Sequence, residues 1–172
     1  MNNKKLIFII LFSLSALVIL ISIWFIIRYT SPFELDDLHP SIQCDDDLIS
    51  SSDILWVVPL YENDSIALHP DWCSHILSFN KTIQLHGVYH TYREFGTYRN
   101  DDYVSLGVEE FEKCFGFKPT SFKPPQIYYN RINDESLKDN NLSYHIRIYQ
   151  ILRKVYHCSD TGEFKNWVVK AF

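Results

Sequence analysis

A short β-prone run leads into two histidines in the stretch Thr82-Ile83-Gln84-Leu85-His86-Gly87-Val88-Tyr89-His90-Thr91. The run predicts a strand that ends at His86, and Gly87 permits a tight turn after it. Two imidazoles four residues apart can converge on one divalent metal ion, and neutral imidazole is among the commonest zinc ligands. The pair is therefore a candidate for metal binding, and two unrelated core or surface histidines are the alternative.

An apolar segment of 22 residues without a charge runs from Leu6 to Ile27, which is long enough to cross a bilayer as a helix. No small-residue cleavage site follows it, so we predict an uncleaved signal anchor at 6–27. Lys4 and Lys5 precede the segment and only Arg28 follows it closely. This bias predicts a cytoplasmic N-terminus at residues 1–5 and a single-pass membrane protein whose domain is lumenal or extracellular.

The residues after the apolar segment are acidic. All 21 Asp and Glu lie after the segment. Of the 16 Lys and Arg, Lys4 and Lys5 precede the segment and Arg28 directly follows it, which leaves 13 for the rest of the chain. The formal net charge of that part is therefore about −8. Such a balance argues against nucleic acid as a partner. Nothing in the sequence indicates a particular oligomeric state.

Three N-glycosylation sequons support the exported orientation and predict a glycoprotein: Asn63-Asp64-Ser65, Asn80-Lys81-Thr82 and Asn141-Leu142-Ser143. Each is an acceptor only if the chain enters a glycosylating compartment. Outside the cytoplasm one or two disulfides could form, in a pairing that the sequence leaves open, among Cys44, Cys73, Cys114 and Cys158. Buried free thiols are the alternative.

Strands and helices are predicted to alternate after the anchor. Apolar or alternating runs predict strands at 33–35, 54–58, 82–86, 121–123, 144–148 and 152–157. Helical spacing predicts helices at 69–79, at 103–115 with caps at Asp101, Asp102 and Gly116, and at 164–172, with a short helix or a loop at 44–52. The alternation predicts one parallel α/β domain, open or barrel-like, with reactive groups at the carboxyl ends of strands. Four strands end in such groups: Asp36-Asp37, His86, Lys123 and His157.

The order of these motifs resembles the polysaccharide deacetylase superfamily, also called NodB-like or carbohydrate esterase family 4. Within it the chain is similar to the short deacetylase-like branch of unknown substrate. The resemblance covers about residues 33–160 and lies in the segments 33–40, with its pair of aspartates, 56–61, 86–91, 115–125 and 155–157. It implies a pared-down distorted (β/α) barrel at residues 33–172, preceded by one transmembrane helix.

The resemblance also implies a function. It implies a metal-dependent hydrolase that removes an acetyl or other acyl group from an N- or O-acetylated glycan or similar substrate, acting on carbon–nitrogen bonds other than peptide bonds. One divalent metal ion, usually zinc in this family, would be held by Asp37, His86 and His90, and it would polarise the acyl carbonyl. Asp36 would be the general base, His157 the general acid, and Lys123 would stand where the family has an arginine that orients the base.

The chain departs from the family pattern in three ways. Lys123 replaces the arginine, Gln126 stands where an aromatic residue is usual, and there is no D-x-x-D-W motif. A catalytically inactive, membrane-anchored binding module for glycan or protein is therefore the alternative function, and a structural membrane protein with incidental histidines is a third.

Several neighbouring residues have plainer interpretations. The aspartate pair could be only a capping or turn feature, and His157 a satisfied core histidine. We expect Glu94 at a solvated loop position, His39 to stabilise a turn, and Trp56 and Trp72 to lie in the core rather than to form a platform for sugars.

Overall fold

The computed structural model describes residues 3–145 and 148–171, and the chain divides into two compact units, Met1–Ser31 and Pro32–Phe172. The described part of the first unit is the helix α1 (Asn3–Thr30), whose apolar side chains, such as Phe8 and Phe12, are exposed. Its most apolar window has a mean hydropathy of 3.1. At 1.5 Å per residue, its 28 residues extend about 42 Å, which exceeds the roughly 30 Å hydrocarbon core of a bilayer. The helix is therefore long and apolar enough to span a membrane.

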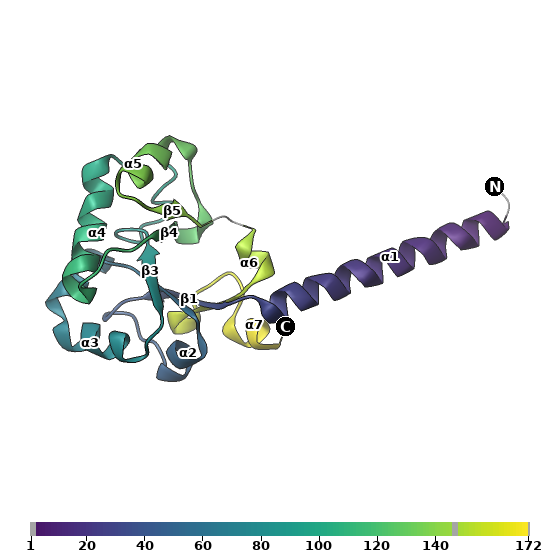
Figure 1. The fold of residues 1–172 in the computed structure, drawn as a ribbon, viewed down its shortest axis with the longest axis horizontal. Coiled ribbons are helices and arrows are strands. Elements are labelled where there is room, and N and C mark those ends of the chain that lie inside the picture. The colour runs from purple at the N-terminus through teal and green to yellow at the C-terminus, as the bar shows by residue number, and fades with distance from the viewer. Residues whose placement is uncertain (1–2, 146–147, 172) are drawn as a thin grey trace. The chain divides into compact units, whose positions relative to one another are not determined.

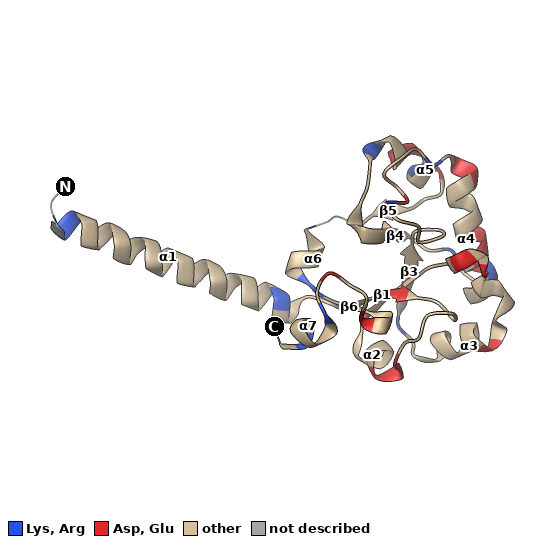
Figure 2. Cartoon of the chain, turned by 180° about the vertical axis from the view of Figure 1, so that it is seen from behind, with Lys and Arg blue, Asp and Glu red and all other residues tan. Residues whose placement is uncertain are grey.

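Charged residues have different distributions in the two units. Figure 2 shows basic residues at both ends of α1 and acidic residues on the helices α2 to α5 of the second unit. The α1 helix itself is uncharged between Lys5 and Arg28.

Six parallel strands form one sheet in the second unit, in the order β5-β4-β3-β2-β1-β6. Figure 1 labels four of them, β1, β3, β4 and β5. The strands are β1 (Phe33–Leu38), β2 (Ile54–Val57), β3 (Thr82–His86), β4 (Ser121–Lys123), β5 (Ser143–Tyr144) and β6 (Lys154–His157). The helices are α2 (Asp46–Ser51), α3 (Pro70–Ser78), α4 (Asp101–Phe115), α5 (Asp134–Asp139), α6 (Tyr149–Leu152) and α7 (Asn166–Ala171). The predicted parallel α/β class is confirmed.

The strand order brings the predicted reactive groups to one edge. β1 to β5 follow one another across the sheet and β6 returns to pair with β1, which is the succession of strands around a (β/α) barrel. No pairing joins β5 to β6 among the described residues, so the described sheet is open. Asp36 pairs with His157, and His86 with Lys123, at the carboxyl ends of neighbouring strands. The sheet therefore aligns these four residues before any side-chain contact is considered.

The core lies where the sheet meets α3 and α4. Its buried side chains come from the strands and from the two helices: Leu35, Leu55, Leu85, Phe122, Ile76, Val104, Val108 and Phe111. Helix α4 begins two residues before the predicted 103–115 segment because its N-cap is Asn100, whose side chain accepts the N–H of Tyr103. Gly116 ends the helix with a φ of 77°, as predicted.

The region between β5 and β6 differs from the prediction. The predicted strand 144–148 is reduced to β5, residues 146 and 147 lie outside the described residues, and Ile148 is the N-cap of α6. In this one-turn helix the Tyr149 ring lies 4.1 Å from the guanidinium carbon of Arg153. Residues four apart meet when the backbone is helical, which an alternating apolar pattern does not reveal. Helix α5 was not predicted, and the final helix begins at Asn166 rather than at residue 164.

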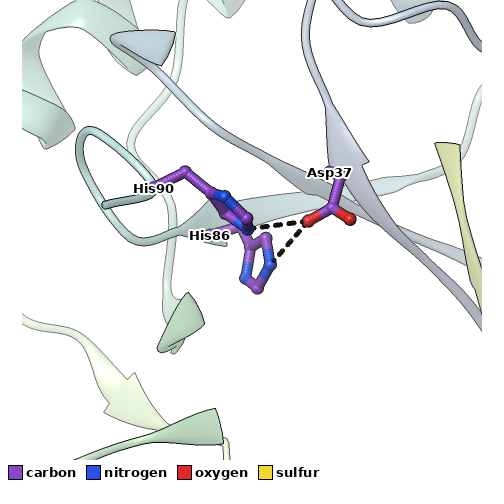
Figure 3. Close-up of side chains that lie close together, drawn as sticks. All are labelled: Asp37, His86 and His90. Atoms are coloured by element: carbon purple, nitrogen blue, oxygen red, sulfur yellow. Dashed lines mark ion pairs between the residues drawn. The ribbon is translucent and has the colours of Figure 1, made fainter. Parts of the chain in front are cut away.

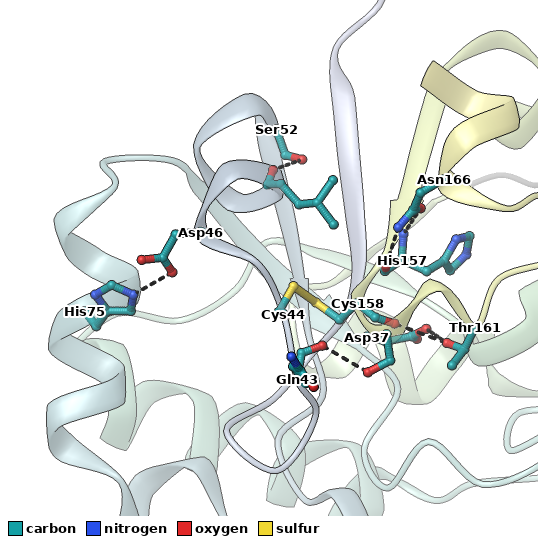
Figure 4. Close-up of a disulfide and its surroundings, with 12 residues drawn as sticks. Asp37, Gln43, Cys44, Asp46, Ser52, His75, His157, Cys158, Thr161 and Asn166 are labelled. Atoms are coloured by element: carbon teal, nitrogen blue, oxygen red, sulfur yellow. Dashed lines mark hydrogen bonds and ion pairs between the residues drawn. A yellow bond between two sulfur atoms is a disulfide. The ribbon is translucent and has the colours of Figure 1, made fainter. Parts of the chain in front are cut away.

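Two disulfides join all four cysteines. Cys73 of α3 is bonded to Cys114 of α4, which fastens the two core helices together. Cys44, in the loop after β1, is bonded to Cys158, directly after β6 (Figure 4). The sequence left this pairing open.

Candidate metal centre

The two aspartates at the end of β1 are separated by a backbone irregularity. The register of β1 with β2 shifts between Leu35 and Leu38, and Asp37 has a left-handed φ of 64°. A bulge of this kind breaks the alternation of side chains along a strand. Both Asp36 and Asp37 are buried, at 3% and 6% exposure, although they are consecutive.

The two histidines lie at the end of β3 and in the turn after it. Gly87 has a φ of 65°, and a Cβ there would overlap Oε2 of Glu94 and lie 2.6 Å from Cγ of Pro125. Glycine is therefore required both by conformation and by space. The turn then reverses, and His90 itself has a φ of 59°.

The three predicted metal ligands converge. Nε2 of His86 lies 3.2 Å from Oδ1 of Asp37, and Nε2 of His90 lies 2.8 Å from the same oxygen (Figure 3). One ligand atom from each of the three residues lies within 4.8 Å of the others. A carboxylate from β1 thus meets two imidazoles from the β3 end, the remote contact on which the sequence interpretation depended.

This donor set suits a divalent metal ion. The ring of His86 donates through Nδ1 to the carbonyl of Lys123, 3.0 Å away, which leaves Nε2 as the basic nitrogen facing Asp37. Thr161 donates to Oδ2 of Asp37 at 3.1 Å and so orients the carboxylate. Two histidines and one carboxylate provide three ligands and leave coordination positions open, as in catalytic zinc sites.

Without a metal, the three side chains compensate one another's charge. Burial alone would raise the pKa of Asp37, but its close contacts with His86 and His90 lower it well below its ordinary value. Burial alone would lower the pKa of His90, but the Asp37 carboxylate raises it. The site therefore favours an ionised Asp37 next to a positive charge.

Glu94 shapes the histidine turn. The prediction of a solvated position was wrong, because Glu94 is 0% exposed and lies under the turn. Its carboxylate accepts the backbone N–H groups of Val88, Tyr89 and His90 at 2.8 to 3.2 Å. Tyr103 donates to it at 2.6 Å, and burial together with the Glu94 charge raises the pKa of Tyr103. Successive N–H groups that meet one carboxylate fix the backbone that carries His90.

We expect Glu94→Gln to weaken zinc binding by about 10-fold, a typical cost of losing support for a ligand. An amide presents N–H groups to the backbone donors that the carboxylate now accepts. Calorimetric titration with zinc measures the change, and Glu109→Gln, at an exposed site on α4, is the matched control. Equal affinities in Glu94→Gln and the parent protein would show that the turn holds His90 without this carboxylate.

Lys123 lies between two carboxylates. Its Nζ donates to Oδ1 of Asp36 at 2.7 Å and to Oε2 of Glu34 at 2.9 Å, and Lys123 is 1% exposed. The lysine thus contacts the residue that the resemblance names as the base. Of the two oxygens of Asp36, Oδ1 is the one that accepts this hydrogen bond.

His157 lies near Asp36 but outside the group of three. Its Nε2 is 3.8 Å from Oδ2 of Asp36, and its buried Nδ1 has no hydrogen-bond partner among the described residues. Asn166 bonds both the N–H and the carbonyl of His157, at 2.9 and 2.8 Å (Figure 4). A Cβ at Gly162 would overlap the His157 ring, so the ring can occupy this position only because residue 162 is a glycine.

The plainer interpretations of three other residues hold. His39 is buried and accepts the N–H of Ser41 through Nδ1, as expected of a residue that stabilises a turn. Trp56 is 1% exposed, and Trp72 packs against the core. Gln126 accepts the N–H of Arg93 and so bonds the loop after β3.

The sequence interpretation missed a polar cluster around Glu34. This residue is 0% exposed and lies within reach of four side chains: Trp56, Lys123, His145 and Arg153. The sequence did contain a signal for this cluster. Glu34 stands two positions before Asp36 on a predicted strand, and residues i and i+2 of a strand point to the same face, so the two carboxylates could be expected to share partners.

The second unit thus combines a parallel α/β sheet with a buried Asp-His-His group at the carboxyl edge of that sheet. Comparison with solved structures finds the same fold. The peptidoglycan deacetylase PdaC from Bacillus subtilis matches with a TM-score of 0.54 and 14% identity, over 81% of this chain and 81% of that chain. The polysaccharide deacetylase resemblance is thereby confirmed at the level of the fold.

Two further solved structures match less extensively. A family 4 carbohydrate esterase from Streptomyces lividans has a TM-score of 0.49 and 13% identity, over 67% of this chain and 60% of that chain. BA3943, a CE4 family pseudoenzyme from Bacillus anthracis, has a TM-score of 0.46 and 12% identity, over 54% of this chain. The matched part of this chain spans 32% of the length of BA3943. No protein-family model and no curated protein matches the sequence.

Proposed function

We propose that this chain is a metal-dependent hydrolase that removes an acetyl group from an N- or O-acetylated glycan or a similar substrate. The observation that carries the proposal is the convergence of Asp37, His86 and His90 within 4.8 Å, beside an Asp36 that is bonded to Lys123. The fold shared with a peptidoglycan deacetylase supports an acetylated glycan as the substrate class, as an analogy of fold.

Each residue has one role in the proposal. A divalent metal, zinc by the chemistry of the donor set, would be held by Asp37, His86 and His90 and would supply Lewis-acid polarisation of the acyl carbonyl. Asp36 takes a proton from the attacking water through Oδ2, because Lys123 already occupies Oδ1. His157 gives a proton to the leaving amine or alcohol as the carbon–nitrogen or carbon–oxygen bond breaks.

The test uses the full chain in detergent micelles. We expect one equivalent of bound zinc, and acetate release from N-acetylglucosamine oligomers or from 4-nitrophenyl acetate. His86→Ala should lose both properties, while His75→Ala, on the exposed side of α3, should retain both. A folded parent protein that takes up no zinc at stoichiometric concentration contradicts the proposal.

A binding module without turnover is the second candidate. It is favoured by His157, whose Nδ1 lacks a hydrogen-bond partner among the described residues, since an imidazole that acts as an acid is usually oriented through its second nitrogen. Zinc binding without acetate release, together with retained binding of the glycan oligomers, would favour this module over the hydrolase.

We further propose that α1 is a signal anchor with a cytoplasmic N-terminus and that the second unit is exported and glycosylated. The asparagines of the three sequons, Asn63, Asn80 and Asn141, are exposed. All three also have φ between 53° and 64°, a conformation that by itself favours asparagine.

We therefore expect the protein, after expression in a glycosylating host, to lose mass on treatment with a peptide N-glycosidase. Asn→Gln changes at all three positions should abolish this loss of mass. Unmodified protein whose second unit is digested by protease added to sealed microsomes would reverse the orientation.

A further inference from the structure

We propose that Glu34 is a positioning residue that holds the Lys123 ammonium against Asp36, the base of the proposed reaction. The inference rests on the proposed function for its catalytic consequence. The contacts that it assigns can be tested without activity.

The geometry begins with the alternation of β1. Glu34 and Asp36 are two residues apart on one strand and point to the same face. Lys123 reaches both from β4, at 2.9 Å to Oε2 of Glu34 and 2.7 Å to Oδ1 of Asp36. Its four-carbon side chain would have no fixed direction with one partner. With two partners, the ammonium is fixed between them.

Glu34 is itself held from several directions. Trp56 donates through Nε1 to Oε2 at 2.9 Å, and Arg153 donates to Oε1 at 2.7 Å. Nε2 of His145 lies 3.3 Å from Oε2. These side chains come from β2, from the segment before β6 and from the end of β5. The Glu34 carboxylate therefore has little freedom to follow Lys123 if the lysine moves.

The charges of the cluster balance only when Glu34 is present. Two buried carboxylates, Glu34 and Asp36, face two cations, the buried Lys123 and the partly exposed Arg153. Burial alone would raise the pKa of Glu34, but the charge of Lys123, the nearby His145 ring and the hydrogen bond from Arg153 lower it well below its ordinary value. Loss of Glu34 would leave the buried ammonium of Lys123 with Asp36 as its one carboxylate partner, so the ammonium would lose the second contact that fixes its direction.

This arrangement also accounts for a missing motif. The chain lacks the D-x-x-D-W sequence that its resemblance leads one to expect, and it has a lysine in place of an arginine. Glu34 supplies a carboxylate for that lysine from the same strand as the base. The orientation of Asp36 is thereby secured by residues of β1 and β4.

The first test is Glu34→Gln in the full chain, with zinc content measured alongside turnover. We expect kcat to fall by about 10- to 100-fold, the usual cost of a small misplacement of a reacting group, with KM and zinc content unchanged. In the Lys123→Met background the same change should have no further effect on kcat. Glu110→Gln is the matched control, because Glu110 is a largely buried acid bonded to Ser65 and Lys113 away from the site.

The second test needs no activity. A buried ammonium with two carboxylate partners exchanges its protons slowly, so Lys123 should give a resolved signal in ¹H–¹⁵N spectra of lysine side chains. Glu34→Gln should shift or broaden this signal beyond detection, and Glu110→Gln should leave it in place. If Glu34→Gln does not fold, Glu34→Asp, which keeps the charge but shortens the side chain by one carbon, should shift the signal and lower kcat.

The outcomes separate the two proposals. An unchanged Lys123 signal in both folded Glu34 variants, or an unchanged kcat in Glu34→Gln, overturns the positioning role. Absence of acetate release in the parent protein overturns the proposed function alone, because the Lys123 signal still decides the role of Glu34.

Discussion

Replacing Asp36 by asparagine is expected to lower kcat by about 10²- to 10⁴-fold, the range typical of a lost general base, while zinc stays bound. The amide has nearly the same shape but cannot take a proton from water. Its oxygen can still accept from Lys123, which now donates to Oδ1 of Asp36 at 2.7 Å. The three proposed metal ligands are unchanged, so the loss should appear in turnover and not in metal content.

The control for this change is Asp53→Asn. Asp53 accepts the N–H of Phe33 at 2.9 Å, at the amino ends of β1 and β2 and therefore at the opposite edge of the sheet from Asp36. We expect its variant to keep kcat within about twofold, as is usual for surface changes away from a site. Undiminished acetate release by zinc-loaded Asp36→Asn would require the base to be another group.

Removal of the Cys44–Cys158 disulfide should lower both stability and turnover. The bond closes a separation of 114 residues, for which the chain-entropy relation gives about 5 kcal/mol, and native disulfides typically contribute about 2 to 5 kcal/mol. Cys158 directly follows His157 (Figure 4). The carbonyl of Gln43, next to Cys44, accepts the N–H of Ser159 at 3.0 Å. We expect the Cys44→Ser/Cys158→Ser protein to melt earlier and to show a reduced kcat with normal zinc content.

The second disulfide is a control within the same chain. Cys73–Cys114 closes 41 residues and fastens α3 to α4, so the same relation gives about 4 kcal/mol. Cys73→Ser/Cys114→Ser should therefore lose comparable stability, measured by denaturant unfolding, but keep its kcat at temperatures where it is folded. Equal effects of the two double variants on kcat would mean that the Cys44–Cys158 bond has no special relation to His157.

The sequence predicted the sheet well because local patterns control it. Continuous apolar runs such as 54–58 belong to buried parallel strands, and the structure has β2 at Ile54–Val57. Helix α4 was predicted from its spacing and from Gly116, and only its first turn was misplaced because Asn100 caps it. The short helices α5 and α6 were missed because one or two turns do not establish a helical period.

The sequence predicted those residues of the candidate site that belong to recognisable motifs, but not the buried residues around them. The resemblance placed Asp37, His86 and His90 together, and the structure brings their ligand atoms within 4.8 Å. Burial could not be predicted in the same way. Glu94 was expected in solvent, but it lies beneath the turn because three backbone N–H groups and Tyr103 provide partners for its charge. Similarly, the partners of Glu34 come from four separate segments, a long-range arrangement that spacing does not encode.

The pairing of β6 with β1 has a consequence for the synthesis of the chain. Glu34 of β1 and Val155 of β6 are opposite one another on these strands. During synthesis β1 therefore leaves the ribosome long before β6, its partner strand, has been made. Asp37, His86 and His90 all emerge earlier than β6, and a nascent chain could hold zinc while Glu34 still lacks Arg153 and Asp36 still lacks His157. Metal uptake would then precede competence for chemistry, and stalled chains ending before residue 153 should retain zinc without hydrolysing any acetyl group.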